Sequence, residues 1–138
     1  MDMNCEQIAR DFLVAAASAN EWTPDNVDRI VTGMVADAEY HVFAWQEPFV
    51  GRAAIREELL RQAPLFRPDG CEIVNVASVG TTVFVKRIDR VIMNGARFGV
   101  HVVGVFEVDA NGKIASWRDY CDSAEIALNL RPRNEERP

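Results

Sequence analysis

Three charged residues stand out in the C-terminal half of the chain: Arg87, Asp89 and Asp119. Arg87 and Asp89 are two positions apart, so in a strand their side chains project from the same face. Arginine presents a planar set of donors that can bind two carboxylates at once. When two carboxylates share one cation, the better-paired one stays ionised and the other can hold a proton. These residues would therefore form an acid–base pair if the fold brings them together.

The Arg-x-Asp tripeptide carries little information alone, because Arg67-Pro68-Asp69 has the same spacing and is interpreted as a turn. What matters is whether Asp119, from a later segment, reaches the same face. If it does so only to satisfy buried charges, the three residues form a structural ion triad without a catalytic role.

The pattern of the C-terminal half predicts a β-meander with strands at residues 71–79, 82–93, 96–108 and 113–122. Asn94-Gly95 is the favoured pair for a two-residue type I′ hairpin, because both positions need φ > 0. The segment Asp109-Ala110-Asn111-Gly112 predicts a second turn.

The first hairpin fixes a register. If Met93 pairs with Ala96, Asp89 lies opposite Val100 and Arg87 lies opposite Val102. Either a two-residue or a four-residue second turn then brings Asp119 onto the same face. The other members of this face are almost all apolar: Val83, Val85, Val91, Phe98, Val100, Val102, Gly104, Phe106, Trp117 and Cys121. An unpaired charge on such a face costs several kcal/mol, so we expect the three charged groups to pair.

The N-terminal half predicts helices. The first is an amphipathic helix at residues 4–19. The second is predicted to be capped by Thr23, with an apolar stripe that reaches Met34. The third is predicted to run from Gly51 to the break at Pro64. A short final helix begins at Asp122 or Ser123, where Asp122-x-x-Glu125 resembles a capping box.

Residues 39–44 predict a short strand with Tyr40, Val42 and Ala44 on one face. Alternation then points His41 away from any pocket. We expect Phe43 or Trp45 near the pocket mouth, beside Ala44.

Together these elements predict an α+β fold in which N-terminal helices pack in a strongly curved antiparallel or mixed sheet around an apolar pocket. At 138 residues the chain has the length of one domain, expected at 1–130, with 131–138 as a disordered tail. The residues expected to line the pocket are Val42, Phe98, Val100, Val102, Phe106, Trp117 and Cys121. For each aromatic residue, plain core packing is the alternative.

Composition excludes several classes. The net charge of −6 argues against nucleic acid, which needs a basic surface. No apolar run approaches the roughly 18 residues that a membrane helix needs. Three cysteines without close spacing predict neither a disulfide framework nor zinc, and indicate the cytoplasm. With two histidines, a metal site is not expected either.

The segments VFVKRIDRVI (83–92) and VVGVFEVDANGKIASWRDYCD (102–122) resemble the limonene-1,2-epoxide hydrolase family, whose cone-shaped fold is shared with nuclear transport factor 2 and ketosteroid isomerase. Trp-Arg-Asp-Tyr-x-Asp at 117–122 is the most specific part. A weaker match covers Asp37-Ala38-Glu39-Tyr40 and Gly51-Arg52.

The resemblance implies roles. Arg87 would be the bridging cation, Asp89 the general acid that protonates the epoxide oxygen, and Asp119 the base that activates water. Ring opening would take one step, with no covalent ester, no metal and no cofactor. Tyr40 matches a tyrosine that helps to hold the water, but the family's asparagine two positions later is Val42 here, which removes one hydrogen bond to that water.

The expected substrate is an apolar epoxide of terpenoid, lipid or polyketide-like character, and the resemblance implies a homodimer formed through the sheet. Two alternatives stay open. One is an isomerase or cyclase that moves a proton on an apolar substrate with Asp119 or Asp89. The other is a non-catalytic module that binds small molecules.

Overall fold

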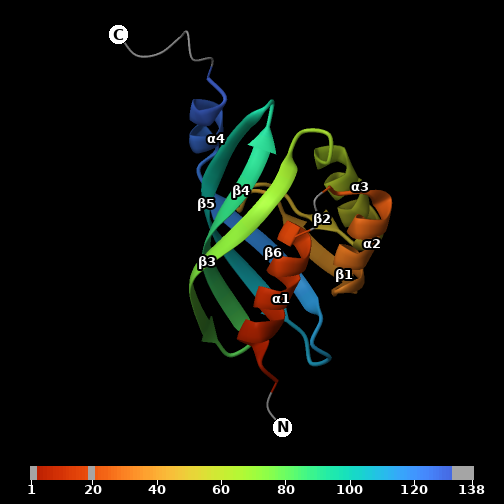
Figure 1. Ribbon diagram of the computed structural model, residues 1–138. Helices are drawn as coiled ribbons and strands as arrows, with labels where there is room; N and C mark the ends of the chain where they lie inside the picture. Colours follow the sequence, from red (N-terminus) through yellow and green to blue (C-terminus); the bar gives the residue numbers. More distant parts are fainter. Residues whose placement is uncertain (1–2, 19–20, 132–138) are drawn as a thin grey trace.

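The computed structural model of the protein describes residues 3–18 and 21–131 (Figure 1). The helices of this part are α1 (Cys5–Ser18), α2 (Pro24–Thr32), α3 (Arg52–Gln62) and α4 (Ser123–Asn129). The strands are β1 (Met34–His41), β2 (Phe49–Val50), β3 (Arg67–Val79), β4 (Thr82–Met93), β5 (Ala96–Val108) and β6 (Ile114–Cys121).

The strands form one mixed sheet in the order β2-β1-β6-β5-β4-β3. Neighbouring strands in the sheet are antiparallel, except that β1 runs parallel to β6. The long strands β3, β4 and β5 bend strongly, with α1 lying against the sheet and α2 and α3 packed together beside β1 (Figure 1). The predicted α+β class, with helices packed in a curved sheet, is confirmed.

The predicted hairpin register is also confirmed. Met93 pairs with Ala96, and Arg87 lies opposite Val102. Asn94 and Gly95 have φ values of 52° and 79°, as a type I′ turn requires. The bounds of β4 and β5 are those predicted, because alternation and a strict turn pair together leave little freedom in register.

Helix α2 begins as its sequence indicates: the Thr23 hydroxyl accepts a hydrogen bond from the Asn26 amide at 3.2 Å, and Pro24 occupies the first turn. The prediction that its stripe continues to Met34 is wrong. The helix ends at Thr32, and Met34 is already the first residue of β1, paired with Ile114. Pairing with β6 replaces the helical turn at this point.

The predicted strand at 39–44 is wrong at both ends. It starts earlier, at Met34, and it ends at His41, so Val42 lies outside the sheet. After His41 the chain leaves the sheet. Nδ1 of His41 is 3.0 Å from the Gln46 backbone carbonyl, and the Ala44 amide donates to the backbone carbonyl of Asp119 at 2.8 Å. The two-residue strand β2 was not predicted, since so short a segment has no readable period.

The interpretation of Arg67-Pro68-Asp69 as a turn is wrong as well. These residues begin β3, where Pro68 pairs with Val91. Proline is tolerated because β3 is an edge strand, and the pairing is interrupted directly after Pro68.

Helix α4 has half of the predicted capping box. The Asp122 carboxylate accepts a hydrogen bond from the Ala124 amide at 2.9 Å. The Glu125 carboxylate does not bond to the Asp122 amide; it accepts instead from the backbone amide of His101 on β5 and lies 2.6 Å from Nδ1 of that ring. The predicted disordered tail, 131–138, lies outside the described residues apart from Arg131.

Two apolar clusters flank the charged pair on β4. The larger joins the buried face of α1 to Val83 and Val85, and the smaller contains Val91 and two valines of β5. Arg87 lies between these clusters along the strand. Burial of each large apolar side chain contributes about 1.5–3 kcal/mol, so the two clusters hold the surrounding backbone in place.

Candidate active site

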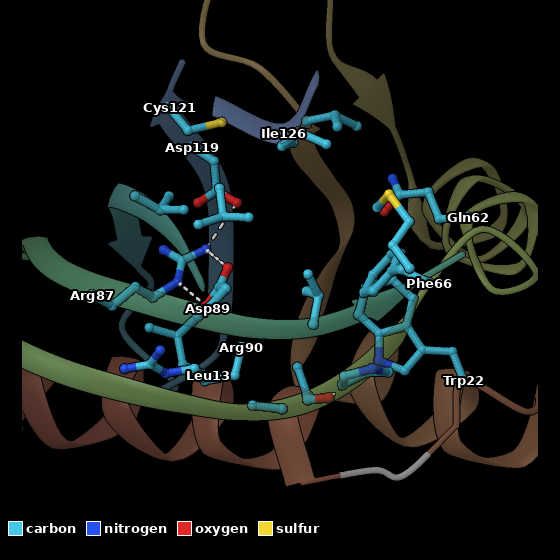
Figure 2. Close-up of a pocket in the computed structure, with 18 of the residues that line it drawn as sticks. Leu13, Trp22, Gln62, Phe66, Arg87, Asp89, Arg90, Asp119, Cys121 and Ile126 are labelled. Atoms are coloured by element: carbon cyan, nitrogen blue, oxygen red, sulfur yellow. Dashed lines mark hydrogen bonds and ion pairs between the residues drawn. The ribbon is translucent and has the colours of Figure 1, made fainter. Parts of the chain in front are cut away.

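One guanidinium holds two carboxylates. Arg87 is 2% exposed; its Nε donates to Oδ1 of Asp89 at 2.8 Å, and its Nη2 donates to Oδ2 of Asp89 at 3.1 Å and Oδ2 of Asp119 at 3.0 Å (Figure 2). The two aspartates come from different strands, β4 and β6, separated in the sheet by β5. The structure thus brings together the three residues that the face argument predicted.

Asp119 is the more buried of the two acids. Its side chain is 13% exposed, against 33% for Asp89. Besides its bond to Arg87, it accepts a hydrogen bond from the Trp117 indole at 3.0 Å through Oδ1. Burial raises the pKa of Asp119, and the nearby Arg87 charge only partly opposes this rise. A carboxylate with a raised pKa is a stronger base than an ordinary one.

Burial by itself would lower the pKa of Arg87, but Asp119 and Asp89 together outweigh it and raise that pKa. The guanidinium therefore keeps its charge. Its Nη1 is buried and has no hydrogen-bond partner among the residues that the structure describes. It faces Gly104 of β5, whose position directly opposite Asp119 leaves space for it.

Sequence reasoning placed Gly104 on this face but missed its role. The available signal was a glycine in the middle of a strand, which often marks a close approach of another group to the backbone.

The three charged residues lie at one end of a cavity of about 170 Å³. This volume is comparable to the roughly 150 Å³ apolar cavity that holds benzene in another protein, so the enclosed part fits about one ring. Tyr40 and five of the predicted wall residues line it: Val42, Val100, Val102, Trp117 and Cys121.

The predictions for Phe98 and Phe106 are wrong. Phe106 is completely buried and packs edge-on against Phe12 and alongside Trp117, so it belongs to the core. Phe98 packs against the smaller cluster around Val91. Sharing a face of a curved sheet does not guarantee access to the cavity, because helix α1 covers part of that face.

Much of the remaining wall comes from outside the meander and was not predicted. Its members include Leu13, Ala16, Trp22, Gln62, Phe66 and Ile126. The apolar face of the first helix could have indicated Leu13 and Ala16, but no sequence pattern shows which helix residues face the sheet's concave side.

Tyr40 lies next to the catalytic candidates. Its ring stacks on Trp117 with centroids 4.3 Å apart, and the residue is 3% exposed. Burial, with the Asp119 charge as a smaller cause, raises the pKa of Tyr40, so its phenol stays neutral. A neutral phenol can both donate and accept a hydrogen bond.

Two other candidates have no part in the acid–base chemistry. Cys121 is half-buried, and burial raises the pKa of its thiol to about 11, so it serves as an apolar wall. His41 points away from the cavity, as predicted, and its Nε2 lies 3.1 Å from Nη2 of Arg118. Trp45 is exposed and does not line this cavity, unlike Phe43.

Within the described residues, no three or more His, Cys, Asp or Glu side chains are grouped so that they could hold a metal ion. In the same part of the chain, no helix is both long and apolar enough to cross a membrane.

The segment that contains this site matches a known protein family. Residues 48–131 match the model of the limonene-1,2-epoxide hydrolase catalytic domain. The chain belongs to the limonene-1,2-epoxide hydrolase family. This match contains Arg87, Asp89 and Asp119, whereas Tyr40 and Val42 lie before it.

Solved structures agree with membership of the limonene-1,2-epoxide hydrolase family. An epoxide hydrolase of this type from M. tuberculosis is 26% identical over 91% of this chain and 88% of its own, with a TM-score of 0.71. A protein with a ketosteroid isomerase-like fold from Catenulispora acidiphila is 20% identical over 95% and 98%, with a TM-score of 0.73.

SalBIII, described as an epoxide hydrolase/cyclase-like enzyme in pyran ring formation in the polyether salinomycin, is 20% identical over 87% of this chain and 92% of its own. Its TM-score is 0.72. These last two similarities show the shared fold alone.

Proposed function

We propose that this protein is a cofactor-independent hydrolase that adds water to an epoxide on an apolar substrate. The observation that carries the proposal is the single buried guanidinium bonded to two carboxylates at one end of an apolar cavity. Opening an epoxide needs a proton at the departing oxygen and a base at the attacking one. Asp89 and Asp119 supply these two functions within reach of one small molecule.

In the proposed reaction, Asp119 accepts a proton from water as the water oxygen bonds to one epoxide carbon. The C–O bond at that carbon breaks, and the protonated form of Asp89 gives its proton to the ring oxygen. The product is a vicinal diol. Net transfer of one proton from Asp119 to Asp89 through solvent then restores the starting state of both acids.

Arg87 stabilises the negative charge that passes between the two acids. Because it bonds to both, it also fixes the direction of each carboxylate. Tyr40 holds the water beside Asp119: its ring is fixed by Trp117, which bonds to Asp119 itself. The apolar valines of β5 bind the carbon skeleton of a terpenoid, lipid or polyketide-like substrate.

The test is turnover of a panel of apolar epoxides in water labelled with heavy oxygen. The proposal predicts diol containing one labelled oxygen, and loss of this product in Asp119→Asn. A wild-type protein that converts no epoxide on the panel would contradict it.

Val42 favours a second candidate, cyclisation. With valine at the position of the family's asparagine, the attacking water has one hydrogen-bond partner fewer. An attacking hydroxyl carried by the substrate itself needs less help, because its carbon chain already positions it. Asp119 would then accept the proton of that hydroxyl and Asp89 would protonate the epoxide oxygen. Adding epoxides that carry a hydroxyl group to the panel separates the two, since a cyclic ether would contain no labelled oxygen.

A further inference from the structure

Gln62, the last residue of α3, is a polar group on an otherwise apolar wall. It lines the cavity together with Phe66 and Trp22, across from Arg87 and its two aspartates (Figure 2). The Trp22 indole is already used, since it donates to the Ala16 carbonyl at 3.1 Å. The Gln62 amide is therefore the group that this wall can offer to a ligand.

The amide is held in one orientation. Its Nε2 donates to Oε2 of Glu58 at 2.7 Å, and Glu58 is 4% exposed. Arg61 donates two hydrogen bonds to the same carboxylate, from Nε at 2.7 Å and from Nη2 at 2.8 Å. The hydrogen bond from Arg61 is the main reason that the pKa of Glu58 is lowered, so this carboxylate is ionised and can only accept.

Because the Glu58 carboxylate can only accept, it orients the Gln62 amide with the nitrogen toward Glu58. The carbonyl oxygen of Gln62 is then left for another partner. A carbonyl oxygen has two lone pairs, so Gln62 keeps an acceptor for a ligand. Gln62 is half-buried, so an apolar ligand that excluded water from this oxygen without bonding to it would meet a desolvation cost.

We propose that Gln62 is a specificity-determining residue that accepts a hydrogen bond from a hydroxyl group of the substrate, at the end of the molecule away from the reacting ring. The substrate class is then an apolar epoxide that carries an alcohol, rather than a plain hydrocarbon epoxide. This inference rests on the proposed function for the identity of the reacting ring, but not for the binding of the alcohol.

The kinetic test compares limonene-1,2-epoxide with the 1,2-epoxide of α-terpineol, in which a hydroxylated isopropyl group replaces the isopropenyl group. Wild type should prefer the hydroxylated epoxide by about tenfold in kcat/KM, the usual effect of one hydrogen bond. Gln62→Met keeps the length of the side chain and removes the acceptor, so the ratio should fall to within about twofold of one. Glu57→Gln, on the exposed side of the same helix, is the matched control and should keep the preference.

A binding test with unreactive ligands works whatever the reaction. In wild type α-terpineol should bind about tenfold more tightly than limonene, and Gln62→Met should abolish this difference. Equal affinities for the two ligands in wild type, or an unchanged preference in Gln62→Met, would overturn the inference. Failure of the proposed hydrolysis would appear separately, as an alcohol preference in binding without turnover of either epoxide.

Discussion

A Cβ atom added to Gly104 would lie 2.5 Å from Nη1 of Arg87, so the guanidinium occupies the space that a side chain at Gly104 would fill. The same atom would lie 3.1 Å from Oδ1 of Asp119. The bare backbone of β5 is therefore part of the site, although it contributes no functional group.

Gly104→Ala is expected to lower kcat/KM by at least about 100-fold, because the displaced guanidinium can no longer hold both acids in place. Gly99→Ala is the matched control. Its Cβ would lie 2.7 Å from a methyl group of Ile88, which does not line the cavity. It would also lie 3.1 Å from Nη1 of Arg90, a lining residue whose ion pair is with Glu72 and not with the two aspartates. Both variants should melt at a lower temperature, and only Gly104→Ala should lose turnover. Equal losses of activity in the two would contradict this role of Gly104.

Replacing either acid by its amide should remove the proton transfers. Asp119→Asn and Asp89→Asn are each expected to lower kcat/KM by about 10²–10⁴-fold. Asp122→Asn is the control, because this exposed residue caps α4 and asparagine caps a helix equally well. Steady-state kinetics on an accepted epoxide would measure the effect. Variants that melt earlier but turn over at the wild-type rate would indicate a purely structural ion triad.

The pH dependence should report Asp119. As the base, it must be ionised, and burial raises its pKa above the ordinary value of an aspartate. The rate should therefore fall, as pH decreases, at a higher pH than an ordinary carboxylate would give. The Trp117 indole lowers this pKa by donating to Asp119, so Trp117→Phe should move the fall to still higher pH. Trp45→Phe, at an exposed indole, should leave the profile in place.

The same shift predicts a change in stability. Because the pKa of Asp119 is higher in the folded protein than in the unfolded chain, the folded state binds the proton more tightly. Its contribution is present at low pH and is lost as pH rises through the folded-state pKa. In Asp119→Asn, unfolding by denaturant should show a smaller loss of stability over that range. An unchanged pH dependence would mean that Asp119 does not titrate in this way.

Val42→Asn is expected to raise the rate of hydrolysis, because it restores a hydrogen-bonding group at the position where the family has asparagine. Val42→Leu keeps the wall apolar and provides the control. The labelled-water assay would measure the change. If the asparagine variant gains no diol and the wild type forms a cyclic ether, water is not the natural nucleophile.

The homodimer implied by family resemblance can be tested on the outer face of the sheet. Phe84, Val103 and Tyr120 are 38%, 37% and 49% exposed on the adjacent strands β4, β5 and β6. A dimer formed through this face would bury them. Val103→Glu should then shift sedimentation from dimer to monomer, whereas Val79→Glu, at the end of β3, should not. A wild-type monomer at micromolar concentration would refute the dimer.

The sequence by itself determined the meander and its register. Strict alternation and the Asn94-Gly95 turn allow one pairing of β4 with β5, and that pairing puts Arg87 and Asp89 on a common face with Asp119. Local physics was sufficient because each step depended on neighbours along the chain or across one hairpin.

Tertiary structure alone decided the shape of the cavity. Whether Phe106 faces a ligand or the core depends on where α1 crosses the concave face, and the path of Val42 depends on the bond between Ala44 and Asp119. The place of Gln62 opposite the acids likewise depends on how α3 packs on β1. Such contacts join segments far apart in the sequence, so no local period encodes them.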